Sequence, residues 1–252
     1  MLNTRTTAGL PFAQCTVDEA TDFLLNWGEA HDRGLAVHVI AAHGVSIADR
    51  DAEFRKIVSQ DSVIFPDSRW LQFLTSLTRT RLTQVRGPSL MRKVLEHPSS
   101  STLSHIFLSP NESVDSSIRL AVRVQFPHLR SLEFTVFPHK MPSAEDTEGI
   151  LKLVAHPEKT IIWIGNGTPM QNYLSNSIAQ ESRCVAIGVG AAFEFICGTQ
   201  SEAAPWISTI GAEWFFRLVS QPKRLWKRYT VGNLLFLWAM LKGALRGDAR
   251  RR

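Results

Sequence analysis

Asp67 is the first residue of the chain whose setting suits proton chemistry. It follows a short apolar run at 62–65 and forms the turn dipeptide Pro66-Asp67 with its neighbour. A carboxylate just past a buried strand is placed to take a proton from a bound hydroxyl. The same side chain could cap the helix that follows, which is the commoner role for such an Asp. The sequence therefore leaves two interpretations of Asp67, a general base and a helix cap.

Two glycine turns and one arginine offer chemistry for binding an anion. Gly165, Asn166 and Gly167 follow one apolar run, and Gly190 closes a Gly-Val-Gly turn after the next. Glycines let the backbone approach a ligand, and free N–H groups in such turns face anions. The spacing matches neither G-x-G-x-x-G nor a P-loop, so ordinary tight turns are the competing interpretation. Arg86, in the turn Val-Arg-Gly-Pro, could pair with a phosphate or with a surface carboxylate.

Histidine and cysteine give no sign of a metal or a cofactor. The eight histidines form no H-E-x-x-H or other ligand spacing, so the sequence predicts neither. The three cysteines form no C-x-x-C pair, which argues against a zinc site and a disulfide framework and fits a reducing cytoplasm. A G-x-S-x-G nucleophile elbow is absent too, so hydrolase chemistry is not supported.

Apolar runs alternate with helical patterns, and these elements must position the loops. Buried strands are expected at 35–42, 62–65, 105–108, 160–164 and 184–188, and early helices at 47–59 and 70–78. This alternation predicts an α/β, Rossmann-like fold with a mostly parallel sheet flanked by helices. Ligands of such folds bind beyond the carboxyl ends of the strands, which is where the loops above are expected.

The charge of this 252-residue chain is divided unevenly. Residues 1–216 carry 18 Lys and Arg against 22 Asp and Glu, whereas residues 217–252 carry 10 basic residues and one acidic residue. A basic tail indicates an anionic partner such as nucleic acid or a lipid surface. The tail also contains an apolar run at 231–241, which is too short to span a bilayer but suits its surface.

That run and the net-negative body disfavour a nucleic-acid partner. Residues 1–10 lack the apolar core of a signal peptide, so export is not expected. We expect an α/β body at 1–210 and a basic, amphipathic, helical C-terminal segment at 211–252 that associates with a membrane.

Several sequence blocks occur in the order found in the WecG/TagA/CpsF glycosyltransferase family, which the chain resembles from about residue 35 to residue 229. The last block is the most specific of them. The blocks are Pro-Asp at 66–67, Val-Arg-Gly-Pro-Ser-Leu at 85–90, Ile-Gly-Asn-Gly-Thr-Pro-Met-Gln at 164–171, Gly-Val-Gly-Ala-Ala-Phe-Glu-Phe at 188–195, and Gly-Ala-Glu-Trp-Phe-Phe-Arg at 211–217 followed by Pro-Lys-Arg-Leu-Trp-Lys-Arg-Tyr at 222–229.

The resemblance implies inverting transfer of a sugar, N-acetylmannosamine or another hexose, from a UDP-sugar donor. The acceptor would be a polyprenyl-diphosphate-linked sugar at the inner face of the cell membrane, in cell-surface polysaccharide synthesis, with no metal required. Asp67 matches the family's base, and Arg86 and Gln171 match residues that line the site. The tail residues that would approach the diphosphate are Arg217, Arg224 and Arg228.

The chain departs from the family's pattern at four positions that matter. Ser68 stands where the family usually has Gly, and Val39 and Ala41 replace a Thr-x-Asn pair. Glu202 reverses the charge of an Arg. A catalytically inactive relative that binds a sugar nucleotide or a lipid diphosphate is therefore the alternative. The sequence sets neither the sugar nor whether copies of the chain form a homo-oligomer.

Overall fold

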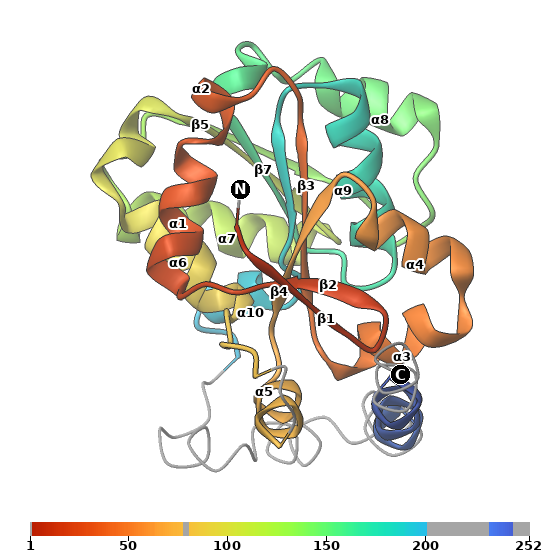
Figure 1. Ribbon diagram of the computed structural model, residues 1–252. Coiled ribbons are helices and arrows are strands. Elements are labelled where there is room, and N and C mark those ends of the chain that lie inside the picture. The colour runs from red at the N-terminus through yellow and green to blue at the C-terminus, as the bar shows by residue number, and fades with distance from the viewer. Residues whose placement is uncertain (1, 78–80, 201–231, 244–252) are drawn as a thin grey trace.

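The computed structural model describes residues 2–77, 81–200 and 232–243 (Figure 1). Within them, eight strands form one sheet in the order β1-β2-β4-β3-β8-β7-β5-β6. The strands are β1 (Thr4–Thr7), β2 (Leu10–Ala13), β3 (Leu35–Ile40), β4 (Ser62–Pro66), β5 (Ser104–Ser109), β6 (Ser131–Val136), β7 (Thr160–Ile164) and β8 (Val185–Gly188). Only β1 and β2 pair antiparallel among these described strands. The predicted mostly parallel sheet is confirmed.

Helices cover both faces of this sheet, as Figure 1 shows. The described helices are α1 (Val17–Leu25), α2 (Trp27–Ala30), α3 (Ala42–Arg50), α4 (Ala52–Ser59), α5 (Arg69–Ser76), α6 (Gly87–Glu96), α7 (Glu112–Gln125), α8 (Ala144–Leu151), α9 (Met170–Glu181), α10 (Ala192–Ile196) and a C-terminal helix at 232–243. The α1, α6, α7 and α10 helices pack on one face, and α4, α8 and α9 pack on the other.

The burial of β7 explains why the central strands read as continuous apolar runs. Ile161 and Trp163 enter the core beneath α6 and α7, while Ile162 and Ile164 enter the core beneath α9. Successive side chains of a strand point to opposite faces, so a strand covered on both sides must be apolar throughout.

Two parts of the fold differ from the expectations. The helix expected at 47–59 is two helices, α3 and α4, because Asp51 is extended and its carboxylate accepts a hydrogen bond from the N–H of Phe54, which caps α4. The strand expected at 35–42 ends at Ile40, since Ala41 is the N-cap of α3. The sequence analysis also missed β6 and the β1–β2 hairpin.

The C-terminal helix is docked on the body by its apolar side. Phe236 and Ala239, each 2% exposed, join the buried cluster that contains Phe12 of β2 and Ile40 of β3. At the far end of the helix, Lys242 forms an ion pair with Asp49 of α3 at 2.8 Å. Among the described residues, no helix combines the length and the apolar character needed to cross a membrane.

Candidate active site

Four neighbouring strands bring several of the described site residues to one edge of the sheet. The strands β4, β3, β8 and β7 are adjacent and parallel, with Ile40 paired to Pro66 and Ile164 paired to Gly188 at their carboxyl ends. The loops that follow them therefore converge, as expected for a parallel α/β sheet. Asp67, Gly165 and Gly190 belong to three of these loops.

Hydrogen bonds to three parts of the chain hold Asp67, and one of them fixes its carboxylate. Its Oδ1 accepts from the N–H of Gly87 at 3.0 Å, at the start of α6. Its own N–H donates to the carbonyl of Ile40 at 3.0 Å, and its carbonyl accepts from Nε2 of Gln84 at 2.7 Å. The positive end of the α6 dipole favours a negative charge at this point. The half-buried carboxylate is thus oriented at the sheet edge and keeps contact with solvent.

The structure changes the helix-cap interpretation of Asp67. The N-cap of the following helix, α5, is Ser68, whose side chain makes no capping bond. Asp67 instead binds the N-terminus of α6, a helix that begins 20 residues further along the chain. Asp67 can therefore bind the N-terminus of α6 and also be placed to act as a general base.

Arg86 lies beside Asp67 because it is the N-cap residue of α6. Its guanidinium carbon is 5.9 Å from the centroid of the Phe195 ring, over α10, and the residue is half-buried. A cation over an aromatic face is oriented as well as attracted. The start of α6 thus holds the carboxylate of Asp67 through Gly87 and carries Arg86 as the residue before it.

The backbone N–H groups of the glycine turns donate hydrogen bonds within the protein. The N–H of Gly167 donates to Oε1 of Gln171 at 3.0 Å, and the N–H groups of Gly165 and Gly190 donate to the carbonyls of Leu108 and Ile164. The expectation of free N–H groups at these three glycines is wrong. The turns are tight strand-to-helix connections, the competing interpretation, in which Gly167 and Gly190 take φ values of +79° and +53°.

Gln171 occupies the space that Gly188 and Gly190 leave because they have no Cβ atom. It is 3% exposed, and a Cβ atom built on Gly188 would lie 2.9 Å from its Cγ. A Cβ atom on Gly190 would lie 3.2 Å from its Oε1. Gly188, the last residue of β8, and Gly190 therefore make room for Gln171, and Gln171 in turn holds the Gly167 loop.

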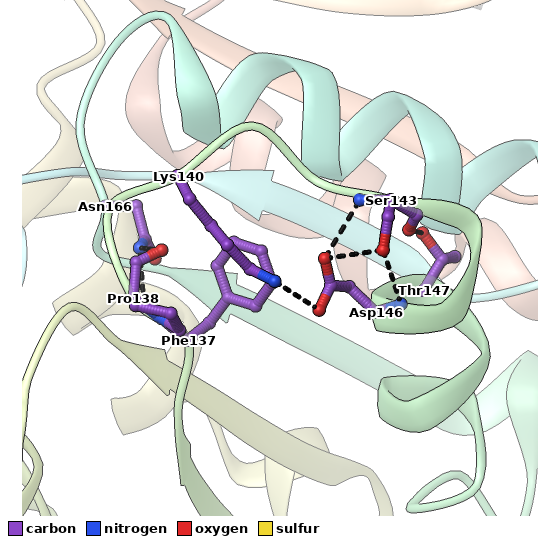
Figure 2. A network of polar contacts seen from close by, with 7 residues as sticks. All are labelled: Phe137, Pro138, Lys140, Ser143, Asp146, Thr147 and Asn166. Atoms are coloured by element: carbon purple, nitrogen blue, oxygen red, sulfur yellow. Dashed lines mark hydrogen bonds and ion pairs between the residues drawn. The ribbon is translucent and has the colours of Figure 1, made fainter.

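Asn166 ties two loops of this edge together (Figure 2). Its Nδ2 donates to the carbonyls of Phe137 and Pro138 at 2.6 and 3.3 Å, in the loop after β6. The same loop is fixed further on, where Lys140 pairs with Asp146 at 2.8 Å. Asn166, which we expected to bind substrate, uses its amide nitrogen inside the protein. Its Oδ1 is buried and has no partner among the described residues.

Two of the positions where the chain departs from the resemblance, Val39 and Ala41, lie toward the carboxyl end of β3. Val39 is 7% exposed, and its Cγ1 would lie 3.6 Å from a Cβ atom on Gly87. It therefore forms an apolar wall against the α6 N-terminus beside Asp67. Ala41 is the N-cap of α3 and offers no side-chain capping bond, where an Asn would supply one.

Four residues named from the sequence lie outside the described part of the chain. They are Glu202, Arg217, Arg224 and Arg228.

Sequence reasoning missed the residues that orient the others. Gly87, whose N–H holds Asp67, was noted only as a neighbour of Arg86, although Pro88 at the start of the helical pattern is a helix-start signal. Phe137 and Lys140 follow β6, a strand that was not expected. Among the residues that the structure describes, no group of three or more His, Cys, Asp or Glu side chains could hold a metal ion.

Comparison with known proteins places this geometry in a family. Residues 5–250 match the sequence profile of the glycosyl transferase WecG/TagA/CpsF family. A similar protein is the N-acetylglucosaminyldiphosphoundecaprenol N-acetyl-beta-D-mannosaminyltransferase of Bacillus subtilis (strain 168). The two chains are 20% identical over 229 residues, which are 90% of this chain and 87% of that protein.

Proposed function

The chain belongs to the WecG/TagA/CpsF family of glycosyltransferases, and on this premise we propose that it transfers a hexose from a UDP-sugar to a polyprenyl-diphosphate-linked sugar. The similar protein of Bacillus subtilis carries in its name an N-acetylmannosaminyl group and an acceptor of N-acetylglucosamine on diphosphoundecaprenol. We propose an acceptor of that type here and an N-acetylmannosamine-like or other hexose as the transferred sugar. The product would enter the synthesis of a cell-surface polysaccharide.

The single observation that carries this proposal is the orientation of Asp67. In the proposed reaction, a hydroxyl of the acceptor sugar attacks the anomeric carbon of the donor, and the bond from that carbon to the diphosphate oxygen breaks. Asp67 takes the hydroxyl proton, and UDP leaves with the bonding electron pair, which gives inversion at the anomeric carbon. The N–H of Gly87 holds one carboxylate oxygen in place throughout, so that the base is oriented before the acceptor binds.

The charge on the departing UDP requires cations or oriented N–H groups. Because the N–H groups of Gly165, Gly167 and Gly190 are engaged, we assign this role first to Arg86 at the start of α6. The arginines at 217, 224 and 228, named from the resemblance, would complete it. Gln171 positions the Gly167 loop.

We place the reaction at the inner surface of the cell membrane, because a polyprenyl diphosphate is anchored there by its lipid chain. Residues 211–252 would form the basic membrane-associating segment and residues 1–210 the catalytic body. The described helix at 232–243 supports part of this assignment, since Leu234, Trp238 and Leu241 are 69%, 54% and 51% exposed on its outer side. An exposed apolar face flanked by basic residues is typical of a helix lying in a bilayer interface.

Release of UDP tests the proposal directly. The full chain is incubated with a panel of UDP-sugars and a short-chain N-acetylglucosaminyl-diphosphate lipid, and both UDP and the disaccharide lipid are measured. We expect one donor to give both products in equal amounts. Saturable binding of a UDP-sugar without either product would instead identify an inactive binding relative.

A further inference from the structure

We propose that helix α5, next to the catalytic Asp67, is a second element that inserts into the membrane interface. Its partner is the surface of an anionic bilayer, and its contact sets the height of Asp67 above the lipid. The consequence of this contact for catalysis rests on the proposed function, but the contact itself can be tested without any turnover.

The outer face of α5 is apolar and exposed. Trp70 and Phe73 are 36% and 55% exposed, and Leu77, the C-cap residue of α5, is 70% exposed, whereas Leu71 and Thr75 on the inner side are fully buried. The rings of Trp70 and Phe73 meet edge to face, with centroids 5.9 Å apart. Exposed large apolar side chains gathered on one short helix indicate an interaction surface. Trp in particular is enriched at membrane interfaces.

Two helices with exposed apolar faces, α5 and the C-terminal helix, share one anchor. Leu71 of α5 and Phe236 of the C-terminal helix belong to the same buried cluster. Figure 1 shows both helices at the lower edge of the molecule, beyond the carboxyl ends of the parallel strands. A membrane surface that contacts the outer face of one of these helices is therefore also near the other helix.

The charge around α5 matches an anionic bilayer. Between Asp67 and Glu96 the chain has six basic residues and no acidic one. Two of them, Arg69 at the start of α5 and Arg81 after it, are exposed. Each basic residue close to an anionic membrane adds about fivefold to binding, and the effect weakens with salt. A second copy of the chain would present the same positive charge to this face, so a bilayer is the better match.

The position of α5 gives this contact a consequence for catalysis. Asp67 is separated from Arg69, the first residue of the helix, by Ser68 alone. The backbone of Asp67 is tied to Ile40 and Gln84, and Leu71 of α5 packs in the same buried cluster as Ile40, so the helix and the carboxylate are attached to the same part of the body. The diphosphate of a polyprenyl-linked acceptor lies at headgroup level, and a helix inserted just below that level would present Asp67 to the sugar attached there.

Paired substitutions in the full chain test the contact. In the first variant Phe73→Ser and Leu77→Ser remove apolar groups from α5 and from its C-cap. In the matched control Leu120→Ser and Val124→Ser remove equally exposed groups, 67% and 70%, from α7. Binding is measured by co-sedimentation with vesicles of phosphatidylglycerol and phosphatidylethanolamine. We expect the α5 pair to lower the partition coefficient at least about tenfold and the α7 pair to change it less than twofold.

The same proteins separate this inference from the proposed function. Turnover of the α5 variant on a short-chain soluble acceptor should equal that of the wild type, while turnover on a long-chain acceptor in vesicles should fall. Leu77→Ser alone, which changes only the C-cap of α5, should give a smaller drop in vesicle binding. This single variant replaces the double variant in the test if the double variant folds poorly. Unchanged vesicle binding would overturn the inference, and so would a wild-type dimer that the α5 pair dissociates while vesicle affinity stays the same. Absence of transfer by the wild type would overturn only the proposed function.

Discussion

Asp67 combines a structural bond with its proposed role as the base, and a single substitution separates them. In Asp67→Asn the remaining amide oxygen can still accept from the N–H of Gly87, so the fold and donor binding should be kept. The loss of the base should lower the transfer rate about 10²–10⁴-fold. The control is Asp61→Asn, the same change at the other end of β4, where the residue is exposed and pairs with Arg33. A rate for Asp67→Asn within a few-fold of wild type would reject Asp67 as the base.

Two buried histidines should make the stability of the protein depend on pH. Burial lowers the pKa of His38 from 6.5 to about 3 and that of His105 to about 4. His105 accepts a hydrogen bond at Nδ1 from the indole N–H of Trp163, so a proton on that atom would break the contact. His38 likewise accepts at Nδ1 from the amide nitrogen of Asn172, at 3.2 Å.

The sign follows from these lowered values. Above pH 6.5 both histidines are neutral in the folded and unfolded states, and the stability is complete. As the pH falls below 6.5 the unfolded chain binds protons that the folded protein cannot, so stability is lost progressively toward the folded pKa values. From pH 7.5 to 5.5 the free energy of unfolding should fall by about 3 kcal/mol for the pair. Urea unfolding at the two pH values measures this, and His105→Gln should remove about half of the difference; an unchanged difference would contradict the assignment.

Individual residues were predictable from the sequence only where the signal was local. Asp67 follows an apolar run and a proline, and Arg86 precedes Gly-Pro, so both stood out as loop residues. The bond between Asp67 and Gly87 spans 20 residues of chain, and no spacing rule predicts it. The packing of Gln171 likewise depends on Gly188, which lies beside Gln171 only because β7 and β8 pair.

At the scale of elements, central strands were easier to predict than edge strands. A strand buried on both faces is apolar at every position, as β7 is, and contrasts with its surroundings. The edge strand β6 alternates exposed and half-buried residues over most of its length and contains Glu133, so its pattern resembles an exposed loop. The division of 47–59 into α3 and α4 depends on the single cap at Asp51.

The junction of β8 with α9 gives a prediction at this scale. Gly188→Ala would place a Cβ atom 2.9 Å from Cγ of the buried Gln171 and force that side chain to move. Such overpacking costs about 1–3 kcal/mol. The free energy of unfolding should fall by that amount, and donor affinity should fall with it as the Gly167 loop loses its bond to Gln171. Gly149→Ala is the matched control, because α8 leaves its Cβ position open and Ala favours a helix by about 1 kcal/mol. Equal stability of the two variants would contradict the packing argument.

At the scale of the whole molecule, catalysis is expected to depend on side chains rather than on a bound ion. The resemblance implies no metal, and the sequence contains no ligand spacing that would hold one. Transfer should therefore continue at an unchanged rate in EDTA. Loss of activity that magnesium or manganese restores would contradict this and would call for a search for carboxylates beyond the described residues.

The C-terminal helix has a docked side and an outer side, and the whole protein should respond differently to changes on each. Phe236 is 2% exposed in the core shared with β2 and β3, so Phe236→Ala should lower the free energy of unfolding by about 3–5 kcal/mol. Leu234, 69% exposed, contributes no such packing, and Leu234→Ser should leave stability within about 0.5 kcal/mol. Under conditions in which both variants are folded, binding to anionic vesicles should reverse this order, with Leu234→Ser weakened and Phe236→Ala close to wild type. Truncation after Tyr229 would remove both sides at once and cannot separate them. Equal stability of the two point variants would mean that the helix is not docked, and equal vesicle binding would remove its outer side from the membrane contact.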